Sequence, residues 1–357
     1  MSLDRRNFLQ TASVSGLAVT AGDSIEHSGS LLDVGGIRVG HFTSKRRPTG
    51  CTVCLFEQPA TAGVDVRGSA PGTRETDLLH PLNTVEAVNA IVLSGGSAFG
   101  LDAASGVMRY LDEKQIGFRV GSLVVPIVPA AILFDLHIGD GSIRPDAQAG
   151  YEACRAATNR SLPEGCVGAG AGATVGKFFG AEHAMKGGLG TAAIRIQDSD
   201  LVVGALAAVN AAGDVLDHRT GAILAGARTA DGSALRNSLA AMVAGATVKP
   251  FSGSNSTIAV VATNARLTKV EANKMAQMAH DGFARAINPV HTAADGDTIF
   301  AAATGTARAK ASVTTIGAIA AECVALAIQR GVLTATGIPG YPAYQDLFGG
   351  SARRDAQ

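Results

Sequence analysis

The sequence predicts one layered α/β domain, with several strands and with helices on both sides of them. Glycine contributes 44 of 357 residues, tryptophan is absent, and aromatic residues make up only 4% of the chain. A core with so few rings must be built from Ala, Val, Ile and Leu, and abundant Gly and Ala let backbones approach closely. This composition disfavours a coiled coil and a disordered chain.

The first half of the chain contains three segments with clear local signals. Residues 31–41, LLDVGGIRVGH, predict short strands around a Gly-Gly turn, and residues 52–56 predict another strand. Residues 91–111 predict a strand, a glycine-rich turn and an amphipathic helix. Ser94 or Ser97 is expected to cap that helix.

The second half continues the alternation. Residues 201–210, LVVGALAAVN, predict a strand that ends in Asn, and residues 257–263 predict a second buried strand. A helix follows, because Thr268 begins a capping box. A last helix is expected from about residue 313 to residue 330, with Gly331 as its stop. No repeat or low-complexity linker divides the chain.

The N-terminus predicts an export signal. Residues 4–10, DRRNFLQ, are similar to a twin-arginine motif, and the weakly apolar stretch after them ends in Val19-Thr20-Ala21, which suits signal peptidase. We therefore expect residues 1–21 to be a targeting segment, residues 22–357 to be a single domain, and the mature protein to be periplasmic. A cytoplasmic protein with a frayed N-terminal extension is the alternative. No later apolar run approaches the ~20 residues that span a bilayer, so no membrane contact is predicted.

Charge and motif content exclude several function classes. Formal charge is zero and no basic block is present, so nucleic acid is not an expected partner. The run GAGAGATVGK fails as a phosphate loop because Phe178 follows Lys177 where a hydroxyl is required, and GGSAFG lacks the second glycine of GxGxxG. The eight His residues are scattered without an HExxH pattern. Neither a cofactor nor a metal is predicted.

Five cysteines form an odd set in a large chain, so no disulfide framework is implied. Cys51 and Cys54 have the CxxC spacing of redox and zinc sites. Residues three apart on a strand point to opposite faces, however, and GCTVCLF is typical of a strand. Two buried thiols are therefore the favoured interpretation.

Ser256 stands where a small polar run meets a buried strand, in SGSNSTIAVVATNA, residues 252–265. A hydroxyl held there can attack the carbonyl on its own N-terminal side. That attack would cut the chain after Asn255 and leave Ser256 with a free α-amine. Such an amine, with an unperturbed pKa of about 7.7–8.0, is a usable general base at neutral pH. The local sequence also fits an ordinary turn residue.

Asp295-Gly296-Asp297 predicts a tight turn that presents two carboxylates. Such a pair can hold an ammonium or shuttle protons. A solvated turn is the plainer interpretation, and the nearby His291 makes only a thin case for a metal site.

Taken in order, many blocks of this chain resemble the P1 family of N-terminal-nucleophile aminopeptidases, also called the L-aminopeptidase/D-esterase or DmpA family. The similarity runs from about Leu31 to about Thr304 and includes the blocks DVGGIRVGH, GVDVRGSAPGTRETDLL, IVLSGGSAFGLDAASGVMRYL, VPAAILFD, GAGATVGK, STIAVVATNA and PVHTAADGDTIFAAATG. The resemblance implies a four-layer α/β/β/α sandwich. It also implies self-cleavage between Asn255 and Ser256 into an α-chain, residues 22–255, and a β-chain, residues 256–357, which stay associated, commonly in a homo-oligomer.

The activity that the resemblance implies is release of N-terminal residues from small peptides, amides and esters through an acyl-enzyme. Some relatives cleave β-peptides or nylon-type amide oligomers. Ornithine acetyltransferases share the general architecture, which leaves acyl transfer as an alternative. A non-catalytic periplasmic binding protein that kept the fold is a third possibility.

Site residues carry over from the family position by position. Ser256 matches the nucleophile, and its freed amine would act as base. Asp295 and Asp297 match the acidic pair of the nylon-oligomer hydrolases and are expected to orient and polarise that amine. Asn210 matches an Asn that helps hold the oxyanion. Lys177 matches a Lys close to the nucleophile, which would tune the charge of the site.

One position departs from the family pattern. Phe134 stands where some members have a Tyr that holds the oxyanion, and Phe cannot donate a hydrogen bond. A backbone N–H or a water must substitute, or the role is absent, and substrate preference is expected to differ accordingly.

Overall fold

One long strand, β2 (Gly50–Val66), joins two β-layers of the protein. The computed structural model describes residues 29–249 and 255–349, so the predicted targeting segment, residues 1–21, lies outside the described residues. The first part of β2 pairs with β1 and β4, and its last part pairs with β16. The register shifts between Leu55 and Ala60, around Pro59, which cannot donate to the ladder.

The resulting nine-stranded mixed sheet has the order β10-β11-β14-β16-β2-β4-β7-β3, with β1 paired to β2. One layer is formed with β2 by β1 (Ile37–Thr43), β3 (Thr73–Arg74), β4 (Ala87–Ser94) and β7 (Ala130–Ile132). The other layer contains β10 (Gly188–Arg195), β11 (Val202–Val209), β14 (Ile258–Thr263) and β16 (Thr298–Ala303).

Alternate residues of each strand enter different hydrophobic cores. On β14, Val260 packs in the core between the two β-layers, while Val261 packs against the helices outside. The same alternation places Cys54 between the layers and Cys51 under the helices of the other side. The expectation of two buried thiols is confirmed, and all five cysteines are free.

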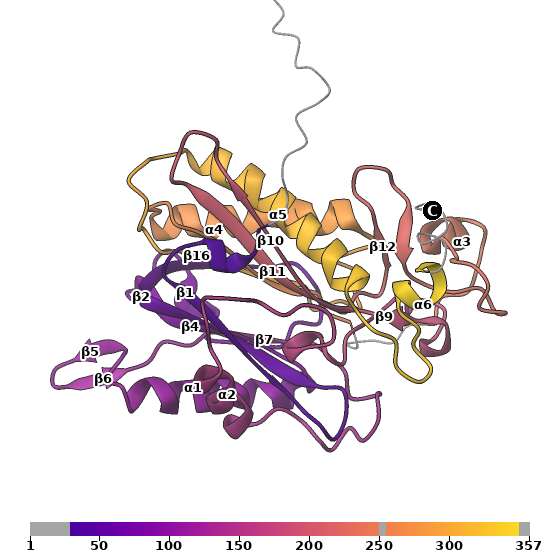
Figure 1. Cartoon of the computed structure of the whole chain (residues 1–357), viewed down its shortest axis with the longest axis horizontal. Helices are drawn as coiled ribbons and strands as arrows, with labels where there is room; N and C mark the ends of the chain where they lie inside the picture. The colour runs from indigo at the N-terminus through magenta and orange to yellow at the C-terminus, as the bar shows by residue number, and fades with distance from the viewer. Residues whose placement is uncertain (1–28, 250–254, 350–357) are drawn as a thin grey trace, which may run out of the picture.

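Helices cover both outer faces of the sandwich (Figure 1). α4 (Lys269–Ala286) and α5 (Val313–Leu333) lie on the layer that contains β14, and α1 (Ala103–Asp112) and α2 (Ala147–Arg155) lie on the layer that contains β4. The predicted four-layer α/β/β/α fold is therefore confirmed. The capping box at Thr268 is present.

The remaining elements are short. They are β5 (Phe118–Val120), β6 (Leu123–Val125), β8 (Thr174–Val175), β9 (Met185–Lys186), β12 (Asp214–Leu216), β13 (Ile223–Ala225), β15 (Ile287–Asn288), α3 (Ser238–Val243) and α6 (Tyr344–Phe348).

Some local expectations were wrong. Residues Leu31–Asp33 form a 3-10 helix rather than a strand, because Ser30 and Asp33 make a capping box around it. Neither Ser94 nor Ser97 caps α1, since a 3-10 turn over Ser97–Asp102 separates them from the helix. Gly331 does not end α5. It lies inside the helix and faces Gly188 of β10, where the absence of a side chain permits close packing.

α5 also corrects the expectation that no long apolar run follows the N-terminus. It has 21 residues, and an 18-residue stretch of it has a mean hydropathy of 1.6, which meets the length and composition of a membrane span. Most of the helix is buried in this structure, against β10, β11 and α4. Its buried residues belong to the hydrophobic core between this β-layer and the helices that cover it.

The close packing of α5 on β10 provides a stability test. A Cβ at Gly190 would lie 2.1 Å from the Ala327 carbonyl oxygen and 2.3 Å from the Gly331 nitrogen. We expect Gly190→Ala to lower the free energy of unfolding by about 1–3 kcal/mol, as overpacking does. Urea denaturation measures the loss. The control is Gly35→Ala, where the nearest atom would be 3.6 Å away. Equal stability of the two variants would contradict this packing.

Candidate active site

Ser256 is buried just before β14, with 2% of its surface exposed. Its backbone N–H donates to the Asn210 carbonyl oxygen at 3.0 Å, directly after the end of β11. The next N–H, of Thr257, donates to Asp297 Oδ1 at 2.8 Å. The segment that enters β14 is therefore held by one neighbouring strand on each side.

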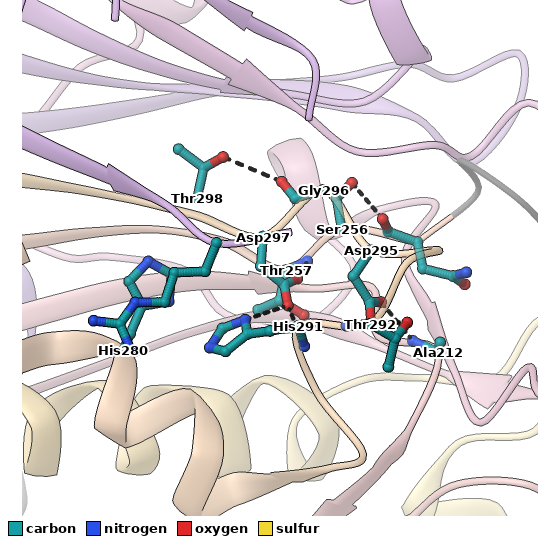
Figure 2. Close-up of polar contacts among 12 residues, drawn as sticks. Ala212, Ser256, Thr257, His280, His291, Thr292, Asp295, Gly296, Asp297 and Thr298 are labelled. Carbon is teal, nitrogen blue, oxygen red and sulfur yellow. Dashed lines mark hydrogen bonds and ion pairs between the residues drawn. The ribbon is translucent and has the colours of Figure 1, made fainter. Parts of the chain in front are cut away.

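The carbonyl before Ser256 is held by two donors. The Asn255 oxygen accepts the Gly296 N–H at 2.8 Å and the Ser256 hydroxyl at 2.5 Å. Figure 2 shows Ser256 beside the turn of Asp295, Gly296 and Asp297. A Cβ at Gly296 would lie 2.5 Å from Ser256 Oγ, so only glycine fits at this position without a shift. The hydroxyl is thus placed against the peptide bond that the sequence predicts to be cut.

Asn210 and Lys177 meet behind this peptide. Asn210 Oδ1 accepts the Thr174 N–H at 3.0 Å and the Lys177 ammonium at 2.9 Å. The Asn210 side-chain N–H donates to the Phe134 carbonyl oxygen at 3.3 Å. In the intact chain, then, Asn210 supports the site from behind, and Gly296 supplies the donor to the Asn255 carbonyl.

Lys177 is almost fully buried, and burial lowers the pKa of its amine to about 7, although the nearby Asp295 and Asp297 oppose that shift. Its Nζ also donates to the Asn210 carbonyl oxygen at 3.2 Å, the same oxygen that accepts the Ser256 N–H. An amine with a pKa near 7 can exchange a proton at neutral pH.

The two carboxylates of the acidic turn are buried, so the solvated-turn interpretation is wrong. Asp295 and Asp297 expose only 2% and 1% of their surface. Burial raises the pKa of Asp295, and the neighbouring Asp297 raises it further. Asp295 accepts from the Thr292 N–H and hydroxyl at 2.9 and 2.6 Å, and from the Ala212 N–H at 3.4 Å.

Asp297 has a second partner that the sequence did not predict. His291 contacts its Oδ2 through Nδ1 at 2.9 Å and through its backbone N–H at 3.2 Å. The His291 backbone has φ of 55°, which non-glycine residues rarely adopt. In the sequence, the only indication of this contact was the short spacing between His291 and Asp297, which was considered as a possible metal site. In the structure, the ring and the backbone N–H of His291 fix the Asp297 carboxylate.

The Phe134 segment is anchored by a buried ion pair that the sequence also did not predict. Arg47 Nη2 contacts Asp135 Oδ1 at 2.8 Å, and Arg47 donates to the Asp135 carbonyl at 2.8 Å. Thr49 donates to the other carboxylate oxygen at 2.7 Å. Because Asp135 follows Phe134 in the chain, this network fixes the Phe134 carbonyl oxygen, which accepts the Asn210 side-chain N–H. The Phe134 ring stacks on His137 and supplies no donor.

A pocket of about 190 Å³ adjoins the site. Its walls are formed by Lys177, Phe178, Ala212, Val248, Lys249, Asn255, Thr292, Ala293 and Ala294. Asn255 and Lys177 connect it to the residues described above.

The α/β/β/α sandwich defines the fold class, and comparisons with solved structures agree. A solved L-aminopeptidase D-Ala-esterase/amidase from Ochrobactrum anthropi, described as a variant of the Ntn hydrolase fold, superposes with a TM-score of 0.67. That match covers 91% of this chain and 94% of the other at 18% identity, so it shows the fold alone. A Burkholderia β-aminopeptidase matches with a TM-score of 0.63 at 21% identity, over 87% of each chain.

Sequence similarity shows the family. The pattern of peptidase family S58 matches residues 29–345, and this chain belongs to that family of aminopeptidase-type hydrolases. An uncharacterized aminopeptidase of Mycobacterium tuberculosis is 45% identical over 348 residues, covering 90% of this chain and 98% of the relative. A 6-aminohexanoate-oligomer endohydrolase of Kocuria is 32% identical over 306 residues, covering 82% of each.

The burial of Lys177 generates a pH test. A folded pKa of about 7, against about 10.4 in an unfolded chain, means that the folded protein binds fewer protons between these values. The contribution of Lys177 to the free energy of unfolding therefore rises with pH across that window, by up to about 1.4 kcal/mol per pH unit. We expect Lys177→Met to lower the slope of unfolding free energy against pH relative to wild type, as urea denaturation at pH 7, 7.5 and 8 would measure. Lys274→Met, at an exposed site, should keep the wild-type slope, and a wild-type slope in Lys177→Met would contradict the assignment.

Proposed function

We propose that this chain cuts itself between Asn255 and Ser256 and then uses Ser256 as an N-terminal nucleophile to hydrolyse small amides and esters. The observation that carries the proposal is the position of the Ser256 hydroxyl, 2.5 Å from the Asn255 carbonyl oxygen that Gly296 polarises. Membership of peptidase family S58 supports the hydrolase activity.

The first step is an N-to-O acyl shift. Ser256 Oγ bonds to the Asn255 carbonyl carbon while the hydroxyl proton passes to the neutral amine of Lys177. The Gly296 N–H stabilises the oxyanion. The C–N bond then breaks, and the Ser256 nitrogen takes the proton to become a free amine. Water hydrolyses the resulting ester, which leaves a carboxylate on Asn255 and a hydroxyl on Ser256.

The second step repeats this chemistry on a substrate. Ser256 Oγ attacks the acyl carbon, its proton passes to the new α-amine, and the amine delivers that proton to the leaving amine or alcohol. Water then hydrolyses the acyl-enzyme and releases the acid. The Asn210 carbonyl is positioned to orient the amine, and Asp297 holds the peptide between Ser256 and Thr257. The carboxylates of Asp295 and Asp297 electrostatically stabilise the protonated form of the Ser256 α-amine.

The two products are expected to stay paired. β14 begins after the cut, yet it pairs with β11 from before the cut, and β16 pairs with β2. Assembly into a homo-oligomer belongs to the same proposal. It is supported by the β5–β6 hairpin, which projects from the body (Figure 1) and exposes the apolar residues Phe118, Val120, Leu123 and Val125.

The names of the relatives indicate two substrate classes for comparison. Release of N-terminal residues from small peptides, amides and esters corresponds to the aminopeptidase relatives. Cleavage of amide oligomers corresponds to the 6-aminohexanoate-oligomer endohydrolases. Loss of p-nitroaniline from alanine p-nitroanilide, against shortening of a 6-aminohexanoate oligomer, separates the two.

Self-cleavage predicts two fragments on a denaturing gel. Wild type should give residues 256–357 and a larger fragment, whereas Ser256→Ala should stay intact. N-terminal sequencing should read Ser256 in the small fragment and, if the twin-arginine segment is removed on export to the periplasm, a start near Gly22 in the other.

Ser256→Thr is the matched control, because it keeps a hydroxyl and should still cut. Light scattering of processed wild-type protein should give a molar mass of two or more α/β pairs. A single intact band from active wild-type enzyme would refute the mechanism, and the mass of one pair would refute the oligomer.

A further inference from the structure

His291 adopts an unfavourable backbone conformation and uses it to hold Asp297. Its φ is 55°, in the left-handed region that residues with a side chain rarely enter. In this conformation the backbone N–H and the ring Nδ1 both reach Asp297 Oδ2, at 3.2 and 2.9 Å. Strained residues persist only where the surrounding structure holds them, and they cluster at functional sites. The conformation of His291 therefore points to a role beyond packing.

Thr292, the next residue, holds the other carboxylate in the same way. Its backbone N–H and its hydroxyl donate to Asp295 Oδ2 at 2.9 and 2.6 Å. Two consecutive residues thus direct one backbone N–H and one side-chain group at each member of the acidic pair. Successive backbone N–H groups in a turn are a recurrent way of binding anions. The segment before the acidic turn is therefore arranged to hold both carboxylates.

The contacts of Asp297 assign the tautomer of His291. A carboxylate accepts hydrogen bonds and has no proton to donate, so the proton of the contact at 2.9 Å belongs to Nδ1 of the ring. The ring Nε2 is buried and has no hydrogen-bond partner among the described residues, which suits a nitrogen without a proton. His291 is therefore a neutral donor to Asp297.

Asp297 connects His291 to the nucleophile. Its Oδ1 accepts the Thr257 N–H at 2.8 Å, and Thr257 directly follows Ser256. Asp297 thereby fixes the peptide group that carries the Ser256 hydroxyl and, after a cut, the Ser256 α-amine. A reacting atom that is misplaced by ~1 Å can lose about 100-fold in rate.

Helix α4 holds the His291 ring on the side away from Asp297 (Figure 2). The ring contacts His280 edge to face, with centroids 4.8 Å apart, and stacks on Phe283 at 5.9 Å. His280 Nε2 in turn contacts the Asp65 carbonyl oxygen at 3.0 Å, and burial lowers the pKa of His280 to about 4, so this ring is neutral at pH 7. Packing on α4 thus keeps Nδ1 of His291 directed at Asp297.

We propose that His291 is a positioning residue for both self-cleavage and turnover, an inference that rests on the proposed function. Its neutral ring donates to Asp297, and Asp297 transmits this restraint to Ser256 through the Thr257 N–H. His291 does not belong to the pocket lining formed by the described residues. Loss of its ring therefore slows the chemical steps and leaves substrate binding nearly unchanged.

Two substitutions separate the hydrogen bond from the backbone conformation. His291→Gly removes the ring and accepts a φ of 55°. His291→Asn also tolerates this conformation, and its side-chain N–H can replace Nδ1–H. We expect His291→Gly to lower the rate of self-cleavage and kcat for p-nitrophenyl acetate at least about tenfold, with KM changed less than about twofold. His291→Asn should restore both rates to within about threefold of wild type.

Self-cleavage would be followed on denaturing gels after pulse labelling, and kcat would be expressed per processed chain. Gln115→Gly is the matched control, because Gln115 has the same φ of 55° at an exposed position after α1. It should keep wild-type rates, and urea midpoints verify that each variant is folded. Wild-type rates in folded His291→Gly would overturn the proposal, as would His291→Asn protein that is as slow as His291→Gly.

A spectroscopic measurement on the uncut chain tests the hydrogen bond apart from either reaction. Ser256→Ala protein labelled with ¹⁵N-histidine should show a proton signal downfield of the amides, from Nδ1–H of His291, and the added change His291→Asn should abolish it. Absence of the signal would overturn the proposal even where His291→Gly fails to fold. The signal together with an uncut wild type would support the bond to Asp297 and refute the self-cleavage mechanism. A cut wild type without the signal would support self-cleavage and refute the role of His291.

Discussion

The site depends on the pairing of β14 with β11 on one side and with β16 on the other. β11 runs antiparallel to β14, so its end brings Asn210 beside Ser256. β16 runs parallel to β14, so the turn before it brings Gly296 and Asp297 to the same point. Residues far apart in the chain thereby meet around one peptide bond, and the strand pairing holds them there.

Electrostatic balance is the second condition, because this edge of the sheet buries several charges. Lys177 lies near Asp295 and Asp297, and each group offsets part of the cost of burying the other. Backbone N–H groups, the Thr292 hydroxyl and the His291 ring contact the two carboxylates and fix the turn. The two carboxylates offset only part of the effect of burial on Lys177. The pKa of its amine is therefore about 7, which suits proton transfer at neutral pH.

Much of this arrangement could be predicted from the sequence. Strand periodicity identified β11 and β14, the capping box identified the start of α4, and resemblance supplied the sandwich and the main site residues. Gly296 was missed as a donor because a backbone N–H leaves no trace in the sequence. The Arg47–Asp135 pair was missed because its partners are 88 residues apart and meet only through the fold. Gly331 was misread as a helix stop because close packing and chain reversal both favour glycine.

The most direct test of the account is to locate the acyl group during turnover. Processed enzyme would be mixed with a p-nitrophenyl ester, quenched in acid and mapped by tandem mass spectrometry. The account predicts one acyl group, on the peptide that begins at Ser256, and none in Ser256→Ala protein. Turnover with the acyl group on another residue, or with the same label in Ser256→Ala, would contradict it.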